Sequence, residues 1–173
     1  MTNFKLENGT LFMEDSKEYV MMAMNENYNG TLNFKEHVSP YLRKEMIGDY
    51  EIEAKFTPMH MSFNDSYGIY SYCGENYVYI ALQAGGDRNI IQSGSCDFME
   101  TENPLKSVDS ESVYLRLKKD GHIYETFFSI DGHEFISCGK NILDSDFTSR
   151  IGFKISTFQG SEFYVKISEI RID

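Results

Sequence analysis

The chain has 173 residues and a formal net charge of −11, from 27 Asp and Glu against 16 Lys and Arg. This length suits one domain with a substantial core, and no linker-like segment divides it, so we expect a single domain over residues 1–173. The acidic balance repels phosphate backbones and anionic headgroups, which argues against nucleic acid and membrane surfaces as partners.

The N-terminal residues show no secretory signal. No basic segment precedes an apolar stretch, and the longest uncharged apolar run, residues 19–24, is far too short to span a bilayer. As written, the sequence predicts a cytoplasmic protein.

Short runs that favour β-strands follow one another along the whole chain. Aromatic residues make up 14% of the sequence and all are Phe or Tyr, which suit pleated, half-buried surfaces. Tyr50, Ile52, Ala54 and Phe56 alternate with charged residues, as in a strand with one wet face. The predicted strands cover residues 4–7, 10–13, 19–24, 30–34, 50–56, 67–73, 77–83, 89–93, 113–118, 123–129, 134–138, 151–158 and 162–172. Such a pattern predicts an all-β fold, either a two-sheet sandwich or a barrel.

Two Asp-Gly pairs divide residues 115–139 into three alternating runs. Because Asp-Gly tolerates positive φ, Asp120-Gly121 and Asp131-Gly132 predict the turns of an antiparallel meander. We expect Gly132 in particular to have a positive φ.

Three further stretches carry local signals of their own. The apolar positions of the last run change parity at Ser168-Glu169, which predicts a bulge. Residues 40–48, bounded by a Pro and a Gly, are expected to hold a short helical turn, and residues 95–112 the longest loop.

Two central runs, residues 67–73 and 77–83, divide into a tyrosine face and a face of aliphatic or small residues. If these strands are neighbours, their tyrosines form one cluster, because alternate side chains share a face. Its members are Tyr70, Tyr72, Tyr77 and Tyr79, and the polar residues that follow are Gln83, Asp87, Arg88 and Gln92.

The order of these segments resembles a known family. An Arg-containing strand precedes a hairpin, a Ser-x-Asp-Gly turn is followed by an aromatic residue, and a Gly-aromatic strand comes near the end; the segments are residues 49–56, 67–70, 113–117, 127–132 and 150–153. Residues 31–173 thus resemble the concanavalin A-like jelly-roll domains at the C-terminus of family 43 glycoside hydrolases, and related stand-alone proteins. The resemblance implies a two-sheet antiparallel jelly roll. Where the family usually has a Trp after the turn, this chain has Phe135 and no Trp, so the largest aromatic platform for a sugar is missing.

The tyrosine face is the candidate binding site. Tyrosine rings beside amide and guanidinium donors are what a neutral or acidic saccharide needs, and a jelly roll presents such rows on its concave sheet. We therefore predict a non-catalytic, lectin-like carbohydrate-binding module whose ligand contacts Tyr70, Tyr72, Tyr77, Tyr79, Arg88 and Gln92. Two other classes stay open: a lectin-fold glycoside hydrolase or lyase, and an interaction or homo-oligomerisation module whose tyrosine face is covered by protein.

No catalytic residue is assigned. A lectin-fold glycosidase would place two carboxylates on one strand face. Glu51 and Glu53 share a face, but they share it with Lys55 and are more simply the solvated side of the strand. Glu125 stands alone.

Metal signals are weak, and no cofactor is expected. The widely spaced cysteines indicate neither a disulfide framework nor a zinc site, and are expected to be free thiols: Cys73, Cys96 and Cys138. The histidines are scattered without ligands at useful spacing: His37, His60, His122 and His133. Oxygen-rich loops leave room for a structural calcium ion, with candidate ligands Asn64, Asp65, Asp87 and Asp97.

Overall fold

The computed structural model describes residues 2–5, 10–12, 19–24, 41–60, 65–85, 88–95, 106–143, 148–156 and 162–173. These residues form fourteen strands in two seven-stranded sheets, and none of them is helical. The first sheet has the order β1 (Thr2–Lys5), β3 (Tyr19–Met24), β14 (Glu162–Ile172), β5 (Tyr50–His60), β10 (Val113–Asp120), β11 (Ile123–Ser129) and β12 (Ile136–Ile142). The second sheet has the order β2 (Thr10–Phe12), β4 (Tyr41–Ile47), β13 (Thr148–Ser156), β6 (Ser66–Cys73), β7 (Asn76–Ala84), β8 (Asn89–Ser95) and β9 (Lys106–Val108).

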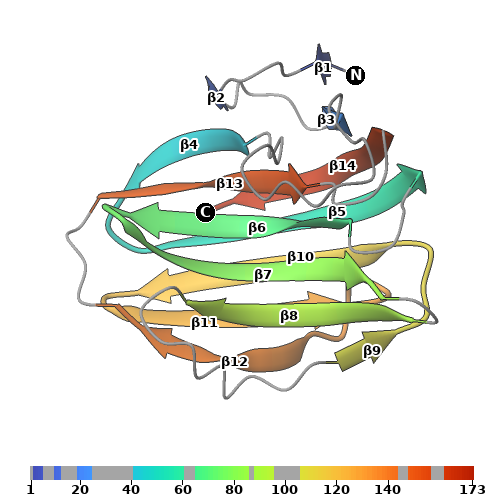
Figure 1. Cartoon of the computed structure of the whole chain (residues 1–173). Helices are drawn as coiled ribbons and strands as arrows, with labels where there is room; N and C mark the ends of the chain where they lie inside the picture. The colour runs from blue at the N-terminus through green and yellow to red at the C-terminus, as the bar shows by residue number, and fades with distance from the viewer. Residues whose placement is uncertain are drawn as a thin grey trace, which may run out of the picture.

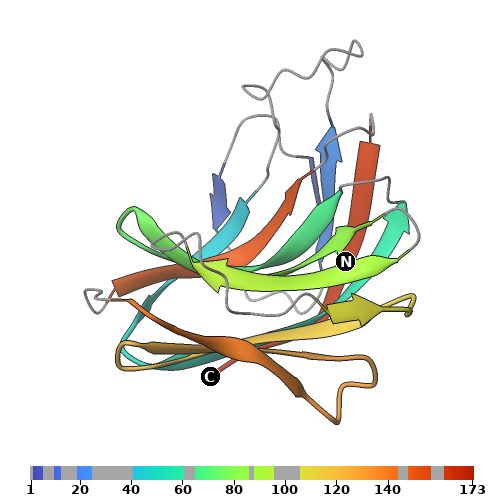
Figure 2. The same ribbon diagram turned by 60° about the horizontal axis from the view of Figure 1, so that its bottom comes forward.

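The two sheets form two layers, with β6, β7 and β8 in front of β10 and β11 in Figure 1. Figure 2 shows the first layer from below, where β10, β11 and β12 lie side by side. All strand pairs are antiparallel except β1 with β3 and β2 with β4 in the part of the chain that the structure describes. The chain crosses repeatedly between layers, since β13 lies between β4 and β6 while β14 lies between β3 and β5. The predicted all-β, two-sheet sandwich is confirmed.

The core follows from the alternation of side chains along each strand. On β5, Ile52, Ala54 and Phe56 are fully buried, and the register places Leu115 of β10 opposite Ala54 and Leu117 opposite Ile52. Burying a large aliphatic or aromatic side chain contributes roughly 1.5–3 kcal/mol relative to leaving it exposed. Because the inner positions are apolar, the intervening residues of each strand stand on the two outer faces, where the candidate sites lie.

The expected helical turn at residues 40–48 is wrong, because this segment is strand β4. Leu42 is buried and Met46 packs against the core, and a spacing of four residues fits either a helix or one face of a strand. Lys44 lies between them on the same side of the strand but is polar and exposed. The sequence therefore lacks the regular apolar alternation that would have predicted a strand.

The expected loop at residues 95–112 also contains a short edge strand, β9, which pairs with β8. The predicted strand at residues 30–34 lies outside the described residues. No helix in the described ranges is long and apolar enough to cross a membrane.

The turn and bulge predictions are confirmed. Gly121 and Gly132 have φ of 58° and 77° and follow β10 and β11. The pairing of β14 with β5 shifts register between Ser168 and Arg171, and Glu169 within the shift has φ 52°.

Strand β12 begins at Ile136, two residues later than predicted, because the chain first wraps around a carboxylate. The backbone N–H groups of His133 and Glu134 donate to Oδ1 of Asp131 at 2.8 and 3.0 Å, and that of Gly132 donates to Oγ of Ser129 at 2.9 Å. These bonds replace strand pairing over residues 130–135, which we call the Asp131 loop.

Candidate functional site

Four tyrosines stand together on the outer face of the second sheet. Strands β6 and β7 pair in a register that sets Tyr70 opposite Tyr79 and Tyr72 opposite Tyr77. The centroids of the first pair of rings lie 5.4 Å apart with planes inclined by 15°, and those of the second pair lie 5.2 Å apart. We call these four residues the tyrosine cluster. Their predicted proximity is confirmed, whereas their predicted role in ligand binding stays a prediction.

The rings of the tyrosine cluster are partly buried against one another. Burial raises the pKa of the Tyr70 and Tyr79 phenols, and neighbouring tyrosines raise it further. Both groups are therefore neutral phenols at physiological pH, able to donate as well as accept a hydrogen bond.

The neighbouring strands surround the tyrosine cluster with small and polar residues. Gly152 of β13 lies opposite Tyr70, and Gly94 of β8 lies opposite Tyr79, so one row of the sheet holds two rings flanked by glycines. A Cβ at Gly152 would lie 1.9 Å from the carbonyl oxygen of Leu42, so only glycine fits there. The row is thereby kept free of side chains beside Tyr70.

Two polar residues beside the tyrosine cluster hold hydrogen bonds. Gln92 lies on β8 opposite Ala81, and its Nε2 donates to Oε1 of Gln83 at 2.5 Å. Lys154 lies on β13, with Nζ 5.2 Å from the ring centroid of Tyr70 and 3.4 Å from the hydroxyl of Tyr72. Gln92 is thus placed one row from Tyr79, as the sequence suggested.

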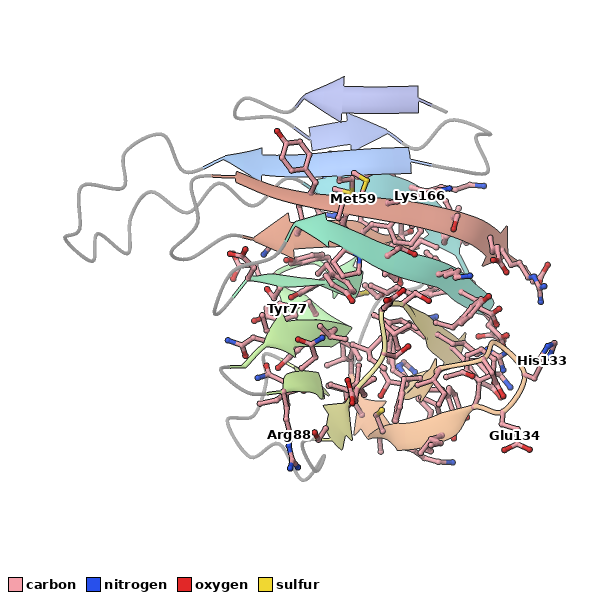
Figure 3. The ribbon with its side chains drawn as sticks, turned by 90° about the vertical axis from the view of Figure 1, so that its right-hand side faces the viewer. Met59, Tyr77, Arg88, His133, Glu134 and Lys166 are labelled. Carbon is pink, nitrogen blue, oxygen red and sulfur yellow. The ribbon has the colours of Figure 1, made fainter. Side chains whose placement is uncertain are left out.

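Arg88 does not join the tyrosine cluster. It is exposed and immediately precedes Asn89, which pairs with Ala84 at the far end of β7 from Tyr77. At about 3.3 Å per residue, the seven residues from Tyr77 to Ala84 span roughly 23 Å. Figure 3 shows Tyr77 and Arg88 well separated, with Arg88 directed away from the sheet. The grouping of Arg88 with the tyrosines is therefore wrong: sequence proximity to the end of β7 did not bring it near the start of that strand.

The carboxylates considered as a catalytic pair lie on the other sheet and form ion pairs with arginine. Oε2 of Glu53 accepts hydrogen bonds from Nε and Nη2 of Arg116 at 2.9 and 2.6 Å, and Arg171 approaches its other oxygen at 3.7 Å. Glu51 lies 3.3 Å from the same Arg116. Glu125 is paired with Lys140 at 2.5 Å.

The expected solvated setting is wrong for Glu53, which is only 4% exposed. The Asp131 loop explains its burial, because the ring of Phe135 lies over the guanidinium of Arg116 at 3.6 Å and closes the ion pair from above. Figure 3 shows this loop, marked by His133 and Glu134, on the opposite side of the molecule from Tyr77. Phe135 is therefore remote from the tyrosine cluster, and its replacement of the family's Trp leaves that surface unchanged.

Comparison with known proteins places the chain in a family. The family described as the β-xylosidase C-terminal concanavalin A-like domain matches residues 8–163, most of the chain. The chain belongs to this family. No curated protein matches.

Solved structures share the concanavalin A-like fold at low sequence identity. A functionally unknown protein from Saccharomyces cerevisiae has a TM-score of 0.70 at 10% identity, covering 93% of this chain and 90% of that protein. The xylan β-1,4-xylosidase of Bacillus halodurans has 0.59 at 15%, covering 76% of this chain and 32% of the enzyme. The marine PL7 alginate lyase of Zobellia galactanivorans has 0.53 at 11%, covering 75% and 64%. This concanavalin A-like domain therefore corresponds to about a third of the xylosidase.

The candidate calcium site of this concanavalin A-like domain is largely outside the described residues. Asp65 is buried, while Asn64, Asp87 and Asp97 are not described. Among the residues that are described, no group of three or more His, Cys, Asp or Glu side chains could hold a metal ion. Cys73 and Cys138 are buried thiols that form no disulfide among the described residues. Cys96 and His37 are outside the described ranges.

Sequence analysis missed Lys154, a cation beside the tyrosine cluster. The signal was available in the alternation of Arg150, Gly152 and Lys154 with buried Ile151 and Phe153. What the sequence lacked was the long-range pairing of β13 with β6, which sets these residues beside the tyrosines.

Proposed function

We propose that this concanavalin A-like domain binds carbohydrate on the tyrosine cluster and performs no chemistry of its own. The observation that carries the proposal is the side-by-side arrangement of Tyr70, Tyr72, Tyr77 and Tyr79 across two paired strands. Stacked tyrosines offer a large, rigid, amphipathic surface at little entropic cost, and their hydroxyls can exchange hydrogen bonds with those of a sugar.

Amide groups next to the rings support the same ligand class. Gln92 and Gln83 are hydrogen-bonded to each other, which fixes both side chains and leaves further amide donor and acceptor capacity for sugar hydroxyls. Preorganised polar groups lose less entropy on binding than mobile ones.

The relatives lend support of a coarser kind. The family takes its description from β-xylosidases, and the similar solved structures include a xylan β-1,4-xylosidase and an alginate lyase. Their activities belong to longer chains, of which this one spans 32% and 64%. What carries over to the proposal is the concanavalin A-like fold of the matched part of each chain.

The carboxylates support binding over hydrolysis. A glycosidase needs two carboxyl groups free to act on either side of one glycosidic bond. Here Glu51 and Glu53 are both engaged by Arg116, on the sheet opposite the tyrosine cluster.

The partial burial of the tyrosine rings also suits a protein partner, because tyrosine is common at protein interfaces. In that case, the surface would be covered by a second copy of the chain or by another protein.

A glycan array combined with light scattering separates these functions. We expect the domain to bind a subset of plant or algal polysaccharide fragments as a monomer and to release no reducing sugar from them. A stable dimer that binds no glycan would favour the interaction module, and reducing-sugar release would show an enzyme.

A further inference from the structure

Lys154 differs from Lys55 and Lys140, two lysines on the other sheet, in the groups that surround its charge. Lys55 pairs with Glu169, and Lys140 pairs with Glu125. Among the described residues, the Lys154 amine instead contacts the Tyr70 ring and the Tyr72 hydroxyl, and it has no carboxylate partner there.

Removing an ammonium group from water without a counter-ion is unfavourable. Burial accordingly lowers the pKa of Lys154, and the Tyr77 phenol only partly offsets this effect. A cation over an aromatic ring recovers part of that loss. An anionic group placed beside the amine would compensate its burial more fully, since charge-assisted hydrogen bonds are about twice as strong as neutral ones.

The surroundings of Lys154 on the same face add positive charge. Arg150 lies four residues away on β13, and its Nη2 donates to the carbonyl oxygen of Gly74 at 3.0 Å. Arg43 and Glu45 of β4 lie opposite Gly152 and Arg150, so the described outward residues of β4 and β13 on this flank include three cations and one carboxylate.

The local charges outweigh the acidity of the whole chain at close range. The net charge of −11 is spread over the molecule, and at physiological ionic strength its field is screened beyond about 8 Å. A ligand in contact with the tyrosine cluster lies within that distance of Lys154.

We infer that the carbohydrate ligand is an acidic saccharide, one that contains a uronic acid, and that its carboxylate accepts a hydrogen bond from Nζ of Lys154 while the sugar contacts Tyr70 and Tyr72. This inference rests on the proposed carbohydrate-binding function and adds the chemical class of the ligand. Gly152, which lies between Arg150 and Lys154 on β13, leaves the space beside Tyr70 without a side chain. The carboxylate can therefore reach the amine of Lys154.

Calorimetric titration with matched acidic and neutral oligosaccharides tests the inference. The probes are tetragalacturonate, tetramannuronate and a glucuronic acid-substituted xylotetraose, each beside its carboxyl-reduced counterpart, which keeps the linkages and lacks the charge. We expect at least one acidic probe to bind about tenfold more tightly than its reduced form, as one charge-assisted hydrogen bond would give. Lys154→Gln should abolish that preference and Lys154→Arg should largely keep it.

Lys118→Gln is the matched control, because Lys118 is an exposed lysine on the outer face of the other sheet. It should leave both affinities unchanged.

Two further measurements follow from the charge of Lys154. The preference for the acidic probe should weaken in 0.5 M salt. The Lys154→Gln variant should melt at the same or a higher temperature than the wild type, because it removes a partly buried charge.

The outcomes distinguish the two proposals. Equal binding of acidic and reduced probes, or a preference that survives Lys154→Gln, overturns the acidic-ligand inference and leaves carbohydrate binding intact. If no probe binds, acidic or neutral, both proposals fail.

Discussion

Phe135 covers Arg116, with the guanidinium carbon 3.6 Å from the centroid of its ring. Beneath the ring of Phe135, Arg116 donates two hydrogen bonds to the buried carboxylate of Glu53. Phe135, the aromatic residue that follows the Ser-x-Asp-Gly turn of this chain, is thus part of a layered contact on the outer face of the first sheet. It stabilises the domain and does not belong to the candidate ligand surface.

Arg116→Met should therefore be strongly destabilising. It leaves Glu53 buried with only the longer contact to Arg171, and removing one partner of a buried ion pair costs about 3–5 kcal/mol. Because the side chain of Arg116 is 26% exposed, we expect a smaller loss of about 2 kcal/mol in the free energy of unfolding. Urea denaturation measures it against Lys118→Met, an exposed position two residues along the same strand face, which should change stability by less than about 0.5 kcal/mol. Equal effects of the two variants would contradict this role for Arg116.

Gly132→Ala should destabilise the folded domain more than Gly121→Ala, although both glycines have positive φ. At Gly121 the added Cβ meets nothing within 4 Å, so only backbone strain of about 1–2 kcal/mol acts, partly offset by a less flexible unfolded chain. At Gly132 the Cβ would also lie 2.8 Å from Cζ of Tyr114. We expect a further loss of about 1 kcal/mol, measured by chemical denaturation. Similar midpoints for the two variants would show that the Asp131 loop does not press on Tyr114.

The ionised Asp131 carboxyl should stabilise the folded domain, and this stabilisation should be lost in acid. Hydrogen bonds from the backbone of His133 and Glu134 and from Ser129 lower its pKa from 3.8 to about 2. A carboxyl with a lowered folded pKa stabilises fully above its unfolded pKa, and this contribution disappears as pH falls from about 4 to about 2. Urea midpoints of the wild type and Asp131→Asn between pH 2 and pH 5 should therefore converge in acid. Parallel curves would show that Asp131 titrates equally in both states.

Glu169 occupies a bulge at φ 52°, where a side chain is strained. Its carboxylate also accepts hydrogen bonds from Tyr114 at 3.0 Å and Lys55 at 3.4 Å. Glu169→Gly and Glu169→Ala lose these contacts equally, but only glycine relieves the strain. We expect the glycine variant to be more stable by about 0.5 kcal/mol, since relief of about 1–2 kcal/mol exceeds the entropic advantage of alanine. Thermal melts that favour alanine would contradict the strained bulge.

Local signals predicted those parts of the fold that local chemistry determines. The turns at Gly121 and Gly132 and the bulge at Glu169 follow from the φ that a residue tolerates and from the parity of apolar positions. Tyr70 and Tyr79 were expected together because alternate side chains of neighbouring strands share a face. In the structure, a two-residue turn at Gly74-Glu75 sets the register that pairs them.

The remaining differences come from contacts between segments distant in sequence. Lys154 lies beside Tyr70 only because β13 pairs with β6, and Glu53 is buried only because the Asp131 loop folds over Arg116. Arg88 was wrongly grouped with the tyrosines because it follows β7 closely in sequence. At about 3.3 Å per residue, the length of that strand separates it from Tyr77.

The central claim, that the tyrosine cluster is an open sugar-binding surface, is tested most directly by measuring ligand affinity and melting temperature together on Tyr72→Ala and Tyr79→Ala. The account predicts that each variant binds the oligosaccharide selected on the glycan array more weakly by roughly 1 kcal/mol or more, while its melting temperature stays close to that of the wild type. If both variants instead melt at clearly lower temperatures, change their oligomeric state and show no loss of glycan affinity, the cluster is a packing surface and the claim is contradicted.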